Sequence, residues 1–381
     1  MYGTAFSGGA NNYGAVYKIV VLGAGAATPR PKSIETVLWS FTAGSDGGMP
    51  TGGLIMDRNG NLYGTTTMGG WHGGGTVFKL SAPHHGSTEW SMHTLWTFRP
   101  NRDGGSPAAG LIAGPDGTLF GTTQTGGAHA AGTVFALAPP PAGETDWTET
   151  TLWQFTGGAD GGHPLASLLI DTAGNLYGTA SLGGTNPLGG TVFMLTRPQG
   201  GASDWTETTL WSFTGAEGAH PASALIGDSE GRLYGTAPFG GASSYGVVYS
   251  LTPPSKGGAA WTEQTLWNFS GGAGGAYPFA SLIADRHGAL YGATHGFSPP
   301  DYAQVLPTIF RISPPPKHMT GWTGTTLVTL APENGWDLLT PLIYAGSGRL
   351  LTTVMQTPQA KPGNWAVDGS ILQISGTGFR N

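Results

Sequence analysis

Short apolar segments alternate with glycine-rich turns along the whole chain, and no stretch of comparable length shows the 3.6-residue period of a helix. One element, Leu-Tyr-Gly-Thr, recurs with little change. Its aromatic residue stands at positions 63, 120, 177, 234 and 291, a constant step of 57 residues. Met1–Thr4 is an earlier copy and Leu350–Thr353 a degenerate later one, so the pattern predicts seven tandem units.

Each unit contains four strand-like segments, which the second unit illustrates. An apolar segment at 53–56 is followed by a turn from Asp57 to Gly60 and by the Leu-Tyr-Gly-Thr strand; a third strand lies at 75–78 and a fourth at 94–98. The Asp side chain can bond backbone amides across the turn while Gly takes the left-handed position, as in a tight hairpin. Four short antiparallel strands per unit predict an all-β fold, a β-propeller built from four-stranded blades.

The fourth strand carries a Trp-x-Phe pair, as at Trp96 and Phe98, and a second Trp often stands six residues earlier, as at Trp90. Even spacing places these rings on one face of the strand, where we expect them to pack between blades. Gly in the middle of the second strand lets a neighbouring backbone or aromatic ring approach closely. An open β-solenoid is the competing architecture, but its rungs are usually shorter and need no such pairs of rings.

We expect residues 1–381 to form a single propeller domain. Its repeat units cover about 1–41, 42–98, 99–155, 156–213, 214–269, 270–330 and 331–381. The second and third strand types occur seven times, the first and fourth only six. Seven blades with incomplete terminal blades fit this count. Six closed blades also fit, if Val37–Phe41 completes the last blade and residues 1–35 form an appended hairpin; we expect seven.

The amino-acid composition argues against disorder and excludes several classes of function. Gly (67) and Pro (28) make up about a quarter of the 381 residues, yet 13 Trp, 12 Tyr and 15 Phe require burial, which argues against disorder. A net charge of −6 with scattered Lys and Arg excludes a nucleic-acid backbone as partner. No apolar run approaches the length of a membrane span. The absence of Cys excludes disulfides, thiolate metal sites and a Cys nucleophile.

The repeated pattern, from Gly53-Leu54-Ile55 through Asp57, Leu62-Tyr63-Gly64-Thr65 and Gly75-Thr76-Val77-Phe78 to Leu-Trp-x-Phe, resembles the GloVer tandem-repeat proteins of bacteria. The resemblance extends from Tyr2 to about Ile312, with a weaker last unit. It implies an exported protein, often anchored at the cell surface. The chain shows no export signal or C-terminal anchor, and because it starts inside a repeat, we expect a signal to have preceded Met1. The resemblance carries over no catalytic residues.

Acidic residues recur in the loops between the fourth strand and the next blade, four residues before a Pro. They are Asp46, Asp103, Asp160 and Glu217. A ring of such acids at the mouth of the channel can hold a cation such as calcium through oxygen ligands, with Asp46, Asp103 and Asp160 as the metal candidates. The simpler interpretation is that each acid caps its own turn. We expect no other cofactor.

The residue before that Pro varies among Met49, Ser106, His163, His220 and Tyr277, and varied chemistry on a repeated frame is where a site can be encoded. His163 and His220 occupy equivalent positions and could serve a metal or a proton transfer. The loops between the second and third strands add further histidines, His72, His129 and His295. Ordinary solvated loop histidines are the simpler interpretation.

Three tryptophans depart from the repeat pattern and fall in these same loops: Trp71, Trp336 and Trp365. Exposed aromatic faces stack on sugar rings, so they suggest a glycan-binding surface together with His72, His129, Tyr277 and His295. Alternatively, Trp336 and Trp365 fill the degenerate last blade.

Three functions therefore stay open. The first is an exported or cell-surface binding module for a glycan or protein partner, through the loop-rich face. The second is an extracellular glycan hydrolase or lyase that uses Asp160, His163, Glu217 and His220. The third is a structural subunit of a larger assembly. No Ser-His-Asp motif, nucleophile elbow or phosphate loop is present, so we favour a binding protein over an enzyme. The sequence does not indicate the oligomeric state.

Overall fold

The protein is an all-β structure. We describe it from a computed structural model, whose described residues contain 27 strands and one short 3₁₀ turn at Gly272–Gly274. The described residues are 1–22, 32–83, 87–200, 204–255, 258, 260–296, 305–316, 320–330, 336–337, 340–346, 348–356, 368–374, 377 and 379. Within these ranges no helix has the length and apolar character that crossing a bilayer requires.

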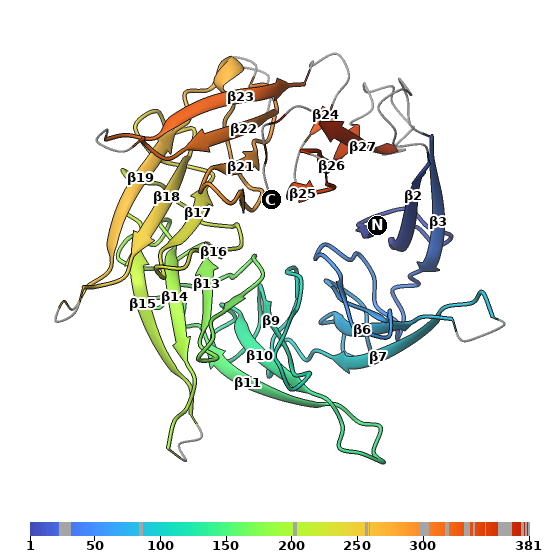
Figure 1. Ribbon diagram of the computed structural model, residues 1–381. Coiled ribbons are helices and arrows are strands. Elements are labelled where there is room, and N and C mark those ends of the chain that lie inside the picture. Colours follow the sequence, from blue (N-terminus) through green and yellow to red (C-terminus); the bar gives the residue numbers. More distant parts are fainter. Residues whose placement is uncertain are drawn as a thin grey trace, which may run out of the picture. The chain divides into compact units, whose positions relative to one another are not determined.

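The strands form seven antiparallel sheets, the blades of a β-propeller, and neighbouring strands within a sheet run side by side, as β9, β10 and β11 do in Figure 1. The first three blades are β1 (Tyr2–Ala5), β2 (Ala15–Leu22) and β3 (Lys32–Ser40); β4 (Ile55–Met56), β5 (Leu62–Thr66), β6 (Thr76–Ser81) and β7 (Ser91–Thr97); β8 (Ile112–Ala113), β9 (Leu119–Thr123), β10 (Thr133–Ala138) and β11 (Thr148–Gln154). The next two are β12 (Leu169–Ile170), β13 (Leu176–Ala180), β14 (Thr191–Thr196) and β15 (Thr206–Ser212); β16 (Ile226–Gly227), β17 (Leu233–Ala237), β18 (Val247–Thr252) and β19 (Thr262–Asn268). The last two are β20 (Ile283–Ala284), β21 (Leu290–Ala293), β22 (Thr308–Ser313) and β23 (Thr323–Thr329); β24 (Trp336–Asp337), β25 (Ile343–Tyr344), β26 (Leu350–Gln356) and β27 (Asp368–Ile374).

The two terminal blades decide between the closures that the sequence left open. Strand β3 pairs with β2, with Ile19 opposite Glu35, so residues 1–40 form one sheet of three strands in which the first strand type is missing. Among the described residues, the last sheet has no strand of the fourth type. The fold therefore has seven blades, and the alternative of six blades with an appended hairpin is wrong.

The seventh blade contains a strand that the repeat pattern does not predict. The repeat pattern predicts a loop at Trp336, but this residue lies in the two-residue strand β24, opposite Gln356 of β26. The physical reason is the length of β26, whose seven residues exceed the five of β5 and leave two backbone positions free to pair.

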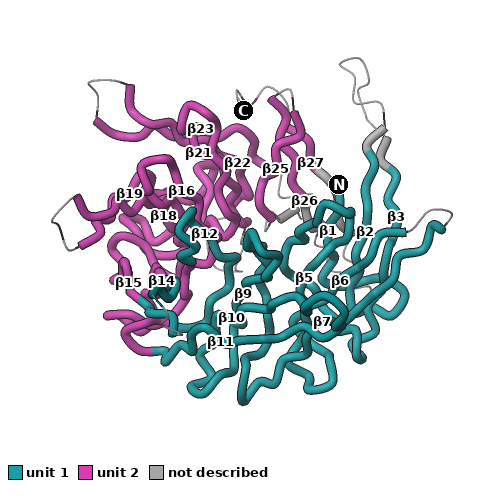
Figure 2. The backbone as a smooth tube through the Cα atoms, turned by 60° about the horizontal axis from the view of Figure 1, so that its bottom comes forward, with its two compact units in different colours: residues 1–157, 162–176, 195–207 teal, residues 158–161, 177–194, 208–381 magenta. Residues whose placement is uncertain are grey.

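The chain divides into two compact units, which Figure 2 distinguishes by colour. The first contains residues 1–157, 162–176 and 195–207, and the second contains 158–161, 177–194 and 208–381. Blades one to three lie in the first unit, blades five to seven in the second, and the boundary passes through the fourth blade.

Glycine in the second strand of a blade makes room for an aromatic ring from the third strand. A Cβ atom added to Gly64 would lie 2.7 Å from the Phe78 ring, which faces it across β5 and β6. Phe78 is fully buried and makes an edge-to-face contact with Phe41 of the first blade, at 5.2 Å between centroids. The same contact recurs between later blades, at 4.9 Å for Phe98 with Phe135, 5.0 Å for Phe213 with Tyr249 and 5.0 Å for Phe269 with Phe310. The predicted close approach at this glycine is confirmed.

The first Trp of the fourth strand also joins neighbouring blades, as the sequence predicts. Its ring meets the aromatic residue of the Leu-Tyr-Gly-Thr strand in the preceding blade, mostly edge to face. The pairs are Tyr2 with Trp90 (5.9 Å), Tyr63 with Trp147 (6.3 Å), Phe120 with Trp205 (6.3 Å), Tyr177 with Trp261 (6.5 Å) and Tyr234 with Trp322 (6.3 Å). Such pairs stabilise a structure by about 0.5–1.5 kcal/mol beyond the area they bury.

The Asp-x-x-Gly turns form as expected. Asp57 accepts hydrogen bonds from the backbone N–H groups of Asn59 and Asn61, and Gly60 has a φ of 81°. The hydroxyl of Tyr63 donates to the other carboxylate oxygen at 3.0 Å. Burial, followed by this bond to Asp57, raises the pKa of Tyr63 to about 12. The turn and the repeated aromatic residue therefore stabilise each other.

One buried hydroxyl in the fifth blade has no hydrogen-bond partner among the described residues, and it belongs to Tyr249. Tyr249 is fully buried, and the third strand of other blades carries Phe78, Phe135, Phe193 or Phe310 at this position. A buried donor without an acceptor costs about 1–3 kcal/mol, because it gives up its bonds to water.

We therefore expect Tyr249→Phe to increase the free energy of unfolding by about 1–2 kcal/mol, measured by urea denaturation. Tyr17→Phe, at the equivalent position of the first blade, is the matched control, because Tyr17 keeps partial solvent access. A Tyr249→Phe variant less stable than the wild type would show that the hydroxyl has a partner after all.

Candidate functional site

Five loops leading into the first strand of a blade hold a residue other than glycine in the left-handed region. These residues immediately precede a Pro, and their φ values are 55° for Met49, 51° for Ser106, 54° for His163, 55° for His220 and 57° for Tyr277. Residues other than glycine rarely adopt this backbone conformation, because it costs of order 1 kcal/mol or more. Where it does occur, it is concentrated at functional sites. These are the variable positions that the sequence singled out.

The preceding blade holds each of these residues in place. The Tyr277 N–H donates to the carbonyl of Tyr245 at 2.9 Å, and Met49 bonds to Tyr13 in the same way at 2.7 Å. The following Pro packs on the glycine that opens the third strand: a Cβ on Gly246 would lie 2.7 Å from Cδ of Pro278. The backbone is therefore fixed by the repeat, while the side chain is free to vary.

In the second unit these loops gather six rings, which we call the aromatic–histidine cluster: His220, Phe239, Tyr245, Tyr277, Phe279 and His295. Phe239 lies at its centre, 5.4 Å from His220, 5.6 Å from Tyr277 and 5.8 Å from Phe279 between ring centroids. Tyr245 contacts Tyr277 at 6.0 Å, and Phe279 contacts His295 at 5.9 Å. Phe239 is 39% exposed and the other five are half-buried, so the cluster forms a surface.

Backbone pairing makes this surface rigid. Phe239 forms an isolated β-bridge with Ala219, next to His220, and His295 forms another with Ala276, next to Tyr277. The loops at 215–222, 238–246, 271–279 and 294–296 contain no Lys or Arg, and their single acid is Glu217. The cluster is thus an uncharged aromatic surface with histidine and tyrosine as its hydrogen-bonding groups.

The pKa of His220, a member of the cluster, is shifted from its ordinary value. Burial lowers the pKa of its imidazole, and a hydrogen bond to the Ser181 backbone offsets part of that shift. The ring is therefore neutral at pH 7, with one nitrogen engaged by the protein. A neutral imidazole offers a donor and an acceptor in total, so one nitrogen is left for a ligand.

The loop acids serve their own turns. Asp46 accepts hydrogen bonds from the backbone and side chain of Thr42 and from Nε1 of Trp39. Asp103 is almost completely buried and pairs with Arg99, and Glu217 accepts from the N–H and hydroxyl of Thr214, both at 2.8 Å. Across the described residues no group of three acids or histidines is arranged to hold a metal ion. This geometry supports the turn-capping interpretation of the acids.

The remaining predicted residues make none of the ring contacts that define the cluster. Trp71 is 80% exposed beside the exposed His72 in the loop after β5, and His129 is exposed in the loop after β9. Asp160 belongs to the second unit and His163 to the first. Trp336 is placed by its backbone in β24, and Trp365 lies outside the described residues.

Sequence reasoning found His220, Tyr277 and His295 but missed Phe239, Tyr245 and Phe279. One signal was available: the loop between β17 and β18 of the fifth blade carries the aromatic residues Phe239 and Tyr245 where the second blade has Met68 and Gly74. What the sequence did not show is that the six rings meet, because they come from four loops in two blades.

The repeat itself identifies the family. The Gloeobacter/Verrucomicrobia repeat matches residues 1–148, 86–298 and 140–364 in overlapping stretches. The chain belongs to this repeat family. No curated protein has a sequence significantly similar to it.

Solved structures with related architecture are distant. A luciferin-regenerating enzyme is 14% identical, with a TM-score of 0.49 over 87% of this chain and 92% of that one. PorZ, a surface component of the type-IX secretion system of Porphyromonas gingivalis, is 13% identical (TM-score 0.48), covering 95% of this chain and 43% of its own. A PL25 ulvan lyase bound to a GlcA–Rha3S saccharide is 11% identical (TM-score 0.45), over 84% and 82%. Identities and TM-scores this low carry no argument about the function of the present chain.

A second ionisable group near the loop acids has a shifted pKa. Burial, and to a smaller extent the neighbouring charge of Glu217, raises the pKa of Glu263 to about 7, although Thr265 donates a hydrogen bond to it. In the folded protein the neutral acid is thus favoured. Stability from this group is fully present below the ordinary pKa of 4.5 and is lost as pH rises through about 7.

We therefore expect Glu263→Gln to raise the melting temperature at pH 8 and to leave it nearly unchanged at pH 5. Allowing for the solvent access that the carboxyl keeps, the gain at pH 8 corresponds to about 1 kcal/mol. Glu144→Gln, at an exposed loop position, should change neither value. Equal effects of Glu263→Gln at both pH values would contradict the raised pKa.

Proposed function

We propose that the protein is an exported or cell-surface binding module that recognises glycans through the aromatic–histidine cluster. The observation that carries the proposal is the continuous set of half-exposed rings around Phe239, held rigidly on strained loops. The C–H faces of sugar rings are apolar and pack on aromatic faces, while their hydroxyls need donors and acceptors such as His220 and Tyr277. Rigid rings lose little conformational entropy on binding.

A binding role fits the cluster better than hydrolysis or elimination. Such chemistry needs an acid and a base directed at the same bond. Glu217 is engaged by Thr214, and the Phe239 ring lies between His220 and Tyr277. The extracellular location rests on the repeat family and forms part of the proposal.

We expect Phe239→Ala to weaken glycan binding by about 5- to 30-fold, because one exposed aromatic contact is worth about 1–2 kcal/mol. The measurement is a glycan array with the wild-type protein, followed by titration calorimetry of the best ligand against both proteins. Leu188→Ala is the matched control, since Leu188 is a 65% exposed apolar residue of another loop in the same unit.

Trp71→Ala tests the alternative position that the sequence suggested. If this variant loses binding and Phe239→Ala does not, the ligand binds at the second blade and the cluster has another role. A wild-type protein that binds no glycan on the array would refute the proposed function.

A further inference from the structure

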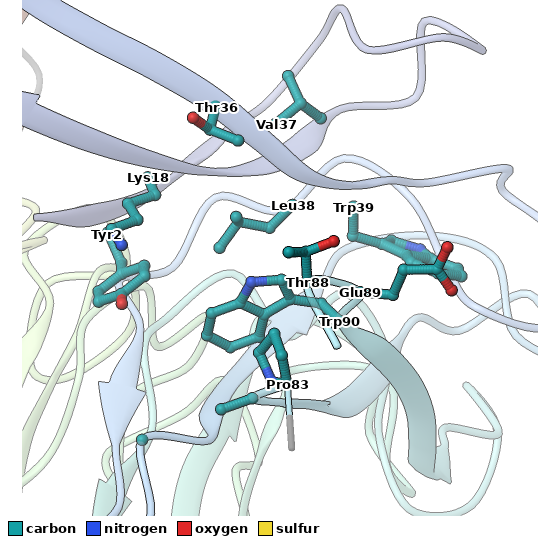
Figure 3. A pocket seen from close by; sticks show the side chains of 12 residues that line it. Tyr2, Lys18, Thr36, Val37, Leu38, Trp39, Pro83, Thr88, Glu89 and Trp90 are labelled. Carbon is teal, nitrogen blue, oxygen red and sulfur yellow. The ribbon is translucent and has the colours of Figure 1, made fainter. Parts of the chain in front are cut away.

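A groove in the first unit lies where the first blade meets the second. Its volume is about 890 Å³, and it lies between β1, β2 and β3 on one side and the loops before β5 and β7 on the other. Figure 3 shows the indole of Trp90 in its middle, with Leu38 above, Pro83 below and the Tyr2 ring to one side. Lys18 stands over Tyr2 at one end, and Glu89 lies beside Trp39 at the other.

The rings of this groove belong to the repeated frame, but the lysine does not. Trp90 and Tyr2 form one of the five blade-to-blade aromatic pairs described above. Lys18 lies directly opposite Tyr2 in the sheet, and Lys79 lies opposite Tyr63 at the next junction. Where Phe120 and Tyr234 take the aromatic position, the residues opposite are Ala136 and Ser250, whereas Arg311 lies opposite Tyr291. Packing between blades therefore does not require a cation here.

Both lysines keep their charge available. Their ammonium nitrogens lie 6.0 Å and 5.8 Å from the ring centroids of Tyr2 and Tyr63, within cation–π range. Neither forms an ion pair with any acid in the part of the chain that the structure describes. The chain has only 16 Lys and Arg residues, and two of them lie over the tyrosines of these equivalent aromatic pairs. A third, Arg311, lies over Tyr291 at the same position of the sixth blade, at 5.7 Å.

We propose that the groove at Trp90 binds an anionic saccharide, with the sugar ring against Trp90 and Tyr2 and its acidic group at Lys18. Glu89 and Thr88 at the opposite end accept hydrogen bonds from sugar hydroxyls. The junction at Tyr63, Lys79 and Trp147 repeats the same combination one blade further on, so a polymer can occupy both. This site is separate from the aromatic–histidine cluster, which has no cation, and does not depend on the function proposed for it.

The test titrates the full chain with three tetrasaccharides: a galacturonate oligomer (carboxylate), a sulfated galactan oligomer (sulfate) and a neutral galactan oligomer. Quenching of tryptophan fluorescence and calorimetry report binding. We expect at least one acidic oligomer to bind and the neutral one to bind at least fivefold more weakly, with affinity falling as salt increases. Comparing the galacturonate oligomer with the sulfated oligomer shows whether the groove recognises a carboxylate or a sulfate.

Lys18→Gln should weaken binding of the acidic oligomer about fivefold, and Lys18→Gln with Lys79→Gln more strongly. Arg286→Gln, which removes an exposed cation in the second unit, is the control and should have no effect. Phe239→Ala should also leave this binding intact, which separates the groove from the cluster. Failure of both acidic oligomers to bind, or equal affinities of the Lys18→Gln and Arg286→Gln variants, would overturn the proposal.

Discussion

The structure depends on a steric constraint inside the first six blades: the second strand carries glycine where the third strand places an aromatic ring. At Gly64 the Phe78 ring occupies the space of a side chain. Because the ring lies there, its edge reaches Phe41 of the preceding blade, and both become fully buried. Replacing the glycine would push the ring away and remove the contact that joins the blades. The glycine in the second strand is thus a packing requirement of the fold, whereas many other glycines adopt a positive φ in turns.

The loops that lead into the first strand of a blade are likewise held by features that the repeat provides. A residue in the left-handed region stands before each Pro, and hydrogen bonds from its backbone to the preceding blade offset the cost of that conformation. Since the backbone is held by groups that every residue has, the side chain can be Met, Ser, His or Tyr without disturbing the fold. A repeat of this kind separates stability from recognition, and the chemistry differs from blade to blade.

Charged residues are scarce, and the two candidate binding surfaces differ in whether they contain any. The aromatic–histidine cluster has neither Lys nor Arg in its loops, and the pKa of His220 is lowered, so it presents hydrogen-bonding groups without charge. The groove at Trp90 combines similar rings with Lys18 and Glu89. Aromatic rings supply contact area at both sites, and the presence or absence of a cation sets which sugars each would accept.

The sequence by itself determined the seven units, the four strand types, the Asp-x-x-Gly turns and the roles of the repeated Trp and Gly, because these features follow from local spacing and recur in most periods. It also marked the variable position at His220 and Tyr277. Tertiary structure alone decided that β3 pairs with β2, that β24 exists, and that Phe239 joins His220 to Tyr277. Those outcomes depend on contacts between residues far apart in the chain. Spacing within one repeat carries no information about which loops of neighbouring blades meet.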